Sequence, residues 1–61
     1  MKSIKEVLME RDGLSEVEAE ELILEARDAL EVYLEDGDFF LADNICEEFF
    51  GLEPDYLMEL I

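Results

Sequence analysis

Carboxylates are the most abundant side chains in this sequence that could do chemistry. Nineteen Asp and Glu residues stand against four Lys and Arg residues, and there is no His. Two carboxylates can act as general acid and base when different surroundings separate their pKa values, usually inside a cleft. A chain of 61 residues with no His, no Trp and no basic residue after Arg27 offers little from which to build such surroundings. We therefore interpret acids such as Glu20, Glu21 and Glu25 as a solvated face, and predict a non-enzyme with no catalytic residue, no cofactor and no small-molecule substrate.

A calcium site is the second kind of chemistry that the acids suggest. If a loop of the EF-hand type began at Asp36, Asp38 would take its third position and Glu47 its twelfth, as such a loop requires. Phe40 and Leu41 then fall at the fifth and sixth positions, where a ligand and a glycine are needed. Asp38 is better explained as a helix cap, so we predict no metal site.

Cys46 is the only cysteine, so it cannot form a disulfide within the chain. One thiol without any His also supplies too few ligands for a structural zinc ion. The neighbouring acids raise the pKa of a thiol, and no cation or base lies close by in sequence to lower it. We therefore predict that Cys46 is a small core residue rather than a reactive site.

The charge of the chain is both large and uneven. The formal net charge is −15, and the basic residues all lie in the first half, at Lys2, Lys5, Arg11 and Arg27. Nucleic-acid phosphates and anionic membranes both attract Lys and Arg, so we expect no direct binding of nucleic acid and no binding to membranes. No segment is apolar enough to span a bilayer, and the N-terminus has no signal-peptide core, which predicts a cytoplasmic protein.

Capping residues mark the starts of the first two predicted helices. Ser3 with Glu6, and Ser15 with Glu18, each have the spacing of a capping box, in which each side chain bonds the other residue's backbone amide. The first box opens a short helix and the second opens a long one over residues 16–36. A glycine follows each helix and is expected to end it.

Two more helices are predicted in the acidic half. Asp38 can cap a third helix that runs to about residue 50, where Gly51 ends it. Pro54 suits the first position of a fourth helix, over residues 54–60.

An apolar stripe on the long helix indicates that the other helices pack against it. Its members recur at spacings of three and four, as one face of an α-helix requires: Ala19, Ile23, Ala26, Leu30 and Tyr33. No strand pattern competes, and Gly and Pro fall only at predicted boundaries, so local and global signals agree. We predict an all-α single domain over residues 1–61, a compact bundle of four helices, one of which is the long central helix.

The C-terminal half has the pattern of a helix-turn-helix unit, in which Gly51 and Leu52 join a helix to a second one started by proline. The second helix offers Asp55 and Glu59 where contacts with DNA need Arg, Lys, Asn or Gln. We therefore expect a helix-turn-helix-like arrangement that does not read DNA, with its two helices crossing near Phe49.

Apolar residues also lie outside the predicted core. Val17 and Leu24 point away from the stripe on the long helix, and residues 57–61 are apolar nearly all round. Exposed apolar surface of this kind marks contact with a partner. The predicted apolar contacts are Val17, Leu24, Phe50, Met58, Leu60 and Ile61. The predicted acidic contacts are Glu31, Glu35, Asp36, Glu47, Glu48, Asp55 and Glu59.

Two segments give the chain a family likeness: residues 8–15, LMERDGLS, and residues 51–57, GLEPDYL. Through them the chain resembles short acidic all-helical uncharacterised proteins of bacteria and bacteriophages. The shared motifs are caps and turns, so the resemblance implies a fold and a context and carries over no activity.

Three functions fit these observations. The first is a protein-interaction module that self-associates through its surplus apolar surface or docks on a basic partner, with the carboxylates giving steering and specificity. The second is a nucleic-acid mimic, whose rows of carboxylates imitate phosphates and occupy a DNA- or RNA-binding protein. The third is a structural protein adapted to high salt, but such a protein would spread its charge evenly, and here the second half is the more acidic.

Overall fold

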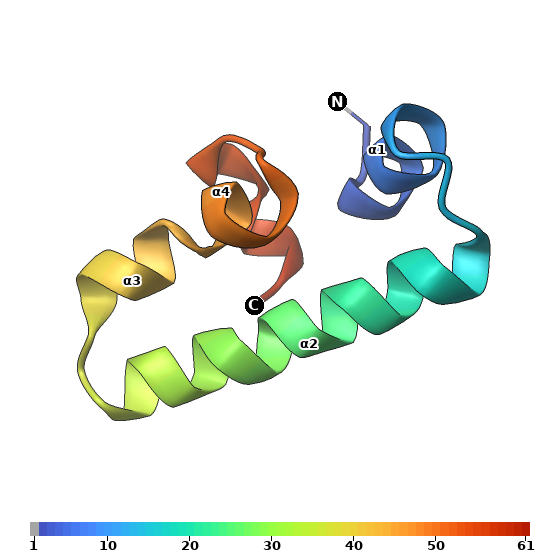
Figure 1. Ribbon diagram of the computed structural model, residues 1–61. Helices are drawn as coiled ribbons and strands as arrows, with labels where there is room; N and C mark the ends of the chain where they lie inside the picture. The colour runs from blue at the N-terminus through green and yellow to red at the C-terminus, as the bar shows by residue number, and fades with distance from the viewer. Residues whose placement is uncertain (1) are drawn as a thin grey trace.

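The helices account for most of the chain in the computed structural model, which describes residues 2–61 and contains no strand within them (Figure 1). The prediction of an all-α protein is thereby confirmed. In chain order the elements are α1 (Ile4–Arg11), α2 (Glu16–Glu35), α3 (Phe39–Asp43), α4 (Ile45–Phe50) and a 3₁₀ helix, η1 (Pro54–Glu59).

Helix α2 is the element on which the others pack. Its 20 residues extend about 30 Å at 1.5 Å per residue, close to the longest dimension of the molecule, 33 Å. Helices α1, α4 and α3 lie along one side of α2, in that order from its N-terminal end (Figure 1). Ala19, Ala26 and Leu30 are the residues of α2 that become fully buried there, as the predicted stripe requires.

The core draws on every helix except η1, with one further residue from just beyond η1. Its buried members are Ile4, Leu8, Ala19, Ala26, Leu30, Ala42, Ile45, Cys46, Phe50 and Leu60. None of them carries a charge, so within the described chain the folded state does not bury an ionised group. Stability therefore rests on apolar burial, at roughly 25 cal/mol for each Å² removed from water.

The start of α2 forms the predicted capping box in full. Ser15 Oγ accepts a hydrogen bond from the Glu18 amide at 3.1 Å, and Glu18 Oε1 accepts one from the Ser15 amide at 3.0 Å. At the start of α1 only half of the predicted box forms: Ser3 Oγ accepts from the Glu6 amide at 3.2 Å, without a return bond from the Glu6 side chain in the described chain.

The predicted third helix is divided in two at Asn44, which makes five helices in residues 2–61 instead of four. The Asn44 side-chain amide donates to the Phe40 carbonyl at 2.7 Å, the acceptor that the Asn44 backbone amide would use in a continuous α-helix. The backbone amide turns to the Leu41 carbonyl instead, at 3.2 Å. Asparagine competes with helical hydrogen bonds in this way.

The fourth predicted helix starts at Pro54 as expected, but it is a 3₁₀ helix. Its bonds span three residues, from the Tyr56 amide to the Glu53 carbonyl at 3.2 Å and from the Leu60 amide to the Leu57 carbonyl at 2.9 Å. Helix α4 and η1 pack together, but residues 54–59 do not supply the second α-helix of a helix-turn-helix unit.

Gly51 turns the chain between α4 and η1. Its φ of 66° lies in the left-handed region that a side chain disfavours, and it lets the Leu52 amide donate back to the Cys46 carbonyl at 3.1 Å. The guanidinium of Arg11 donates to the Phe50 carbonyl at the same helix end, so a cation from α1 caps α4.

Replacing Ser15, which caps α2, tests how much the complete capping box contributes to the free energy of unfolding. We expect Ser15→Ala to lower the free energy of unfolding by about 1 kcal/mol, which is appreciable for a chain of this size, whose total is roughly 3–9 kcal/mol. Urea denaturation followed by far-UV circular dichroism measures the change. Ser3→Ala is the matched control and should cost less, because its box is half formed; a larger loss at Ser3 than at Ser15 would contradict this account.

Candidate interaction surface

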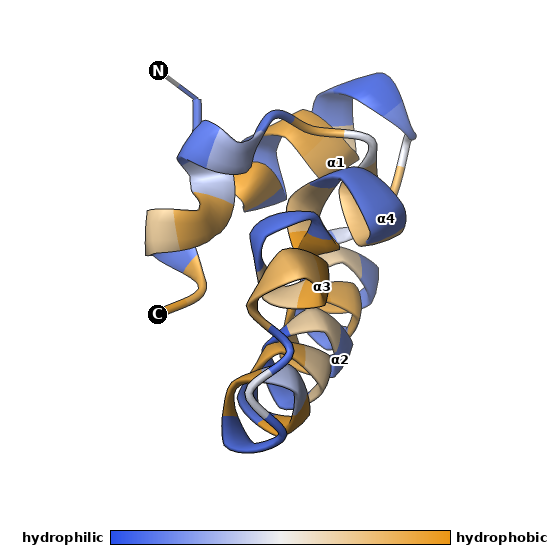
Figure 2. Cartoon of the chain, turned by 90° about the vertical axis from the view of Figure 1, so that its left-hand side faces the viewer, coloured by the Kyte–Doolittle hydropathy of each residue, from blue (hydrophilic) through white to orange (hydrophobic). Residues whose placement is uncertain are grey.

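The most exposed aromatic side chains lie together on α3. Phe39 is 64% exposed and Phe40 is 77% exposed; we call this pair the α3 aromatic face. The side chain of Ala42 on α3 is buried in the core. At 100° per residue, Phe40 lies about 200° away from Ala42 around the helix axis. Phe40 therefore points to solvent. Figure 2 shows α3 in the colour of hydrophobic residues over most of its length.

The sequence-based list of contact residues did not include Phe39 and Phe40. A signal was present, because Phe39, Phe40 and Leu41 are consecutive and three adjacent residues cannot all face one side of a helix. Such a run next to a helix cap predicts at least one exposed large apolar side chain.

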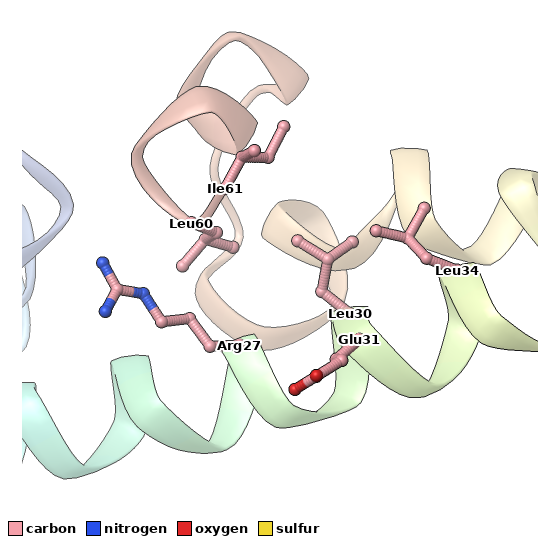
Figure 3. Close-up of a pocket in the computed structure, with 6 residues that line it drawn as sticks. All are labelled: Arg27, Leu30, Glu31, Leu34, Leu60 and Ile61. Carbon is pink, nitrogen blue, oxygen red and sulfur yellow. The ribbon is translucent and has the colours of Figure 1, made fainter.

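An apolar groove lies between α2 and the last two residues (Figure 3). It is open to solvent and has a volume of about 380 Å³. Leu30 rises from α2 toward Leu60 and Ile61, while Arg27 and Leu34 lie toward its two ends (Figure 3). Glu31 completes the lining. Leu30 and Leu60 are buried and form the floor, whereas Ile61 is 83% exposed and stands as a wall.

The structure separates the predicted apolar contacts into two groups. Val17, Leu24, Met58 and Ile61 are exposed, as surface contacts must be. Phe50 and Leu60 are only 2% and 5% exposed and belong to the core, so their assignment to a partner surface is corrected.

Tertiary packing explains both corrections. Phe50 is the last residue of α4, and the turn at Gly51 directs its ring inward, edge-on to Phe49 with the ring centroids 6.3 Å apart. Leu60 follows η1 and lies against Leu30 of α2. Of the exposed four, only Ile61 lines the groove; Val17 and Leu24 lie on the outer face of α2.

The predicted acidic contacts are all exposed, but they belong to three different elements. Glu31 and Glu35 are on α2 with Asp36 at its end, Glu47 and Glu48 are in the first turn of α4, and Asp55 and Glu59 are in η1.

Glu59 also has a structural role. Its Oε1 accepts a hydrogen bond from the Ile4 amide at 3.1 Å, and its backbone carbonyl accepts one from the Arg27 guanidinium at 3.3 Å. Glu59 therefore connects η1 with both α1 and α2.

The other basic side chains are also engaged within the fold. Lys5 pairs with Glu16 at 2.8 Å and with Glu20 at 3.0 Å, joining α1 to α2, and these hydrogen bonds raise the pKa of its ammonium group. Lys2 pairs with Glu10.

Arg11 pairs with Asp12 at 2.9 Å, which holds the pKa of that carboxyl below its usual range. Most acids of residues 28–61 have no cation near them in sequence or in the described structure. A negatively charged surface therefore surrounds the α3 aromatic face and the groove.

Cys46 lies in the core, as predicted, and its thiol is fully buried. Burial raises the pKa of the thiol, and the nearby negative charge of Glu59 raises it further. Both effects disfavour the thiolate, which is the nucleophilic form. Within residues 2–61, no three Cys, Asp or Glu side chains converge as a metal site would need.

Thiol reactivity tests this description of Cys46. In the folded protein we expect an aromatic disulfide reagent to label Cys46 far more slowly than in urea, because the thiol is both covered and protonated. Because the pKa is raised, the difference should persist at mildly alkaline pH, where an ordinary thiol is already ionising. Absorbance of the released thiolate follows the reaction; equal rates in folded and unfolded protein would show that Cys46 is accessible.

Comparison with known proteins adds no relative: no protein-family model matches the chain, and neither the curated proteins nor the solved structures contain a significant match. Within residues 2–61, no helix combines the length and the apolar character needed to cross a membrane. The functional proposals below therefore rest on the geometry and charge of this chain alone.

Proposed function

We propose that the protein is a non-enzymatic protein-interaction module of the cytoplasm that self-associates through the α3 aromatic face. The observation that supports this proposal is the exposure of two adjacent phenylalanines, Phe39 and Phe40, which are the most exposed aromatic side chains of residues 2–61. Contiguous exposed apolar surface on a small domain commonly marks a contact with another chain.

A two-fold contact is the simplest way to cover this surface, because each copy then offers the same face to the other. Such a contact would remove four phenylalanine rings from water, each contributing at most about 1.5–3 kcal/mol. Association itself costs roughly 4–15 kcal/mol at the standard state. The two totals nearly balance, so we expect a weak and reversible dimer.

Charge opposes this contact. Asp36, Asp38 and Asp43 flank the α3 aromatic face and are all exposed, so two copies would bring like charges together. Salt shortens the range of such repulsion, with a Debye length of about 10 Å at 0.1 M and about 3 Å at 1 M. Self-association should therefore strengthen as salt is added, opposite to the behaviour of a contact held by ion pairs.

Sedimentation velocity over a range of salt concentrations tests the dimer. At concentrations on the order of 100 µM, we expect the mass to rise from 7.1 kDa toward twice that value as salt increases. Phe40→Glu should keep the chain monomeric, because it places another charge in the contact.

Val32→Glu is the matched control, since it adds the same charge at an exposed apolar site of α2 that is in neither list of predicted contacts. It should associate as the unmodified protein does. A monomer at every salt concentration, or equal effects of the two substitutions, would remove self-association from the proposal.

Nucleic-acid mimicry is a second candidate function, and a row of acids on α2 favours it. Glu21, Asp28 and Glu35 are exposed and recur every seven residues, which places them on one face at intervals of about 10.5 Å. None of the three has an ion-pair partner in the described structure.

Competition by DNA tests the mimic. We expect the immobilised protein to retain nucleic-acid-binding proteins from a bacterial lysate, and added duplex DNA to release them because both occupy the same cleft. Replacing Glu21, Asp28 and Glu35 together by Gln should abolish retention. Retention that neither DNA nor the triple substitution affects would contradict mimicry.

A further inference from the structure

We propose that the groove between α2 and the last two residues binds the apolar face of a cationic amphipathic helix from another protein. The groove is distinct from the α3 aromatic face, so this site would add a second kind of partner to a self-associating module. Three properties lead to this occupant: the spacing of the lining residues, the depth of the groove and its charge.

The spacing of the lining residues matches a helix. On α2 they are Arg27, Leu30, Glu31 and Leu34, at intervals of three, four and seven residues, so they form one ridge about 10.5 Å long. A partner helix presents its own apolar side chains over the same length, at positions i, i+3 or i+4, and i+7. Two turns of such a helix would therefore lie against two turns of α2.

The depth of the groove favours side chains over a small molecule. Its volume of about 380 Å³ is near the lower end of ligand pockets, but it is open along its length (Figure 3). The floor of Leu30 and Leu60 is already packed, and the walls are Leu34 and the exposed Ile61. Aliphatic side chains pointing down from a helix could contact both walls while the helix backbone stayed outside.

Charge selects a basic helix over a second copy of this chain. Arg27 lies in the lining, but its guanidinium donates to the Glu59 carbonyl, and no other basic residue occurs from position 28 onward. Glu31 lines the groove and Glu35 follows it one turn later on α2. Helix α2 of a second copy carries eight acids and one Arg, so the acids of the groove would repel it. Lys and Arg residues beside the apolar side chains of a basic partner helix would instead be attracted.

Designed peptides test the site without knowledge of the natural partner. The probes are a helical peptide of Leu and Lys with Leu at i, i+3 and i+7, its counterpart with Glu in place of Lys, and a scrambled Leu and Lys peptide of the same composition. Titration of the isotope-labelled protein should show binding of the first peptide only, with the largest shifts in the methyl signals of Leu30, Leu34 and Ile61.

Substitutions then separate groove binding from general attraction to an acidic protein. Ile61→Ser and Leu34→Ser should each weaken binding roughly tenfold, because each removes a wall. Val32→Ser is a control at another exposed apolar position of α2 that does not line the groove, and it should change affinity by less than about twofold. Circular dichroism of each variant confirms that the helices persist.

Each remaining outcome would overturn the proposal. Equal binding of the scrambled peptide, or equal effects of Ile61→Ser and Val32→Ser, would show attraction by charge alone. Shifts at Leu34 and Ile61 that grow with protein concentration in the absence of peptide would make a second copy the occupant. The titration is repeated on Phe40→Glu, so that the groove is tested independently of self-association; loss of binding there would place the peptide on α3 instead.

Discussion

Burial of one stripe of α2 is the interaction on which the rest of the structure depends. Ala19, Ala26 and Leu30 are the positions of this helix that disappear from solvent, and the helices that follow and precede it all pack on that side. Two of the three are alanines, which let the backbones of neighbouring helices come close. No element of residues 2–61 covers the opposite side of α2, which is why its carboxylates, together with Val17 and Leu24, remain exposed.

The scarcity of positive charge is the second constraint, and it comes from the sequence, which has four Lys and Arg residues against nineteen Asp and Glu residues. Lys5, Arg11 and Arg27 each connect two elements of the fold, so little positive charge is left to balance the outer surface. The exposed apolar groups of α3 and of the groove consequently stand in a negative field. Both proposed contacts have this arrangement in common, but the field acts on them with opposite sign: it weakens a contact between two copies and strengthens one with a basic partner.

Local patterns in the sequence predicted the helix boundaries well, because caps and stops depend on a few neighbouring residues. Ser15, Pro54 and the glycines have the positions expected of them. The break at Asn44 was missed, since a side-chain bond to the Phe40 carbonyl competes with a continuous helix at that single position. The site was predicted less well. Exposure of Phe39 and burial of Phe50 follow from how short α3 and α4 are and how they lie on α2, which periodicity along the chain does not contain.

Two hydrogen bonds of Glu59 connect the end of the chain with its beginning and with its longest helix. Its carboxylate bonds the first turn of α1, 55 residues away in sequence, while its carbonyl receives Arg27 from α2. The first turn of α1 and the end of η1 are therefore held together, and a linker that runs over the surface could join the two ends of the described chain. The chain could then be opened elsewhere, for instance at the exposed turn of Gly37, where no side chain crowds the backbone. Such a circular permutant would keep the same contacts in a different order and would carry its free ends just beyond Leu34, at the end of α2 farthest from α1.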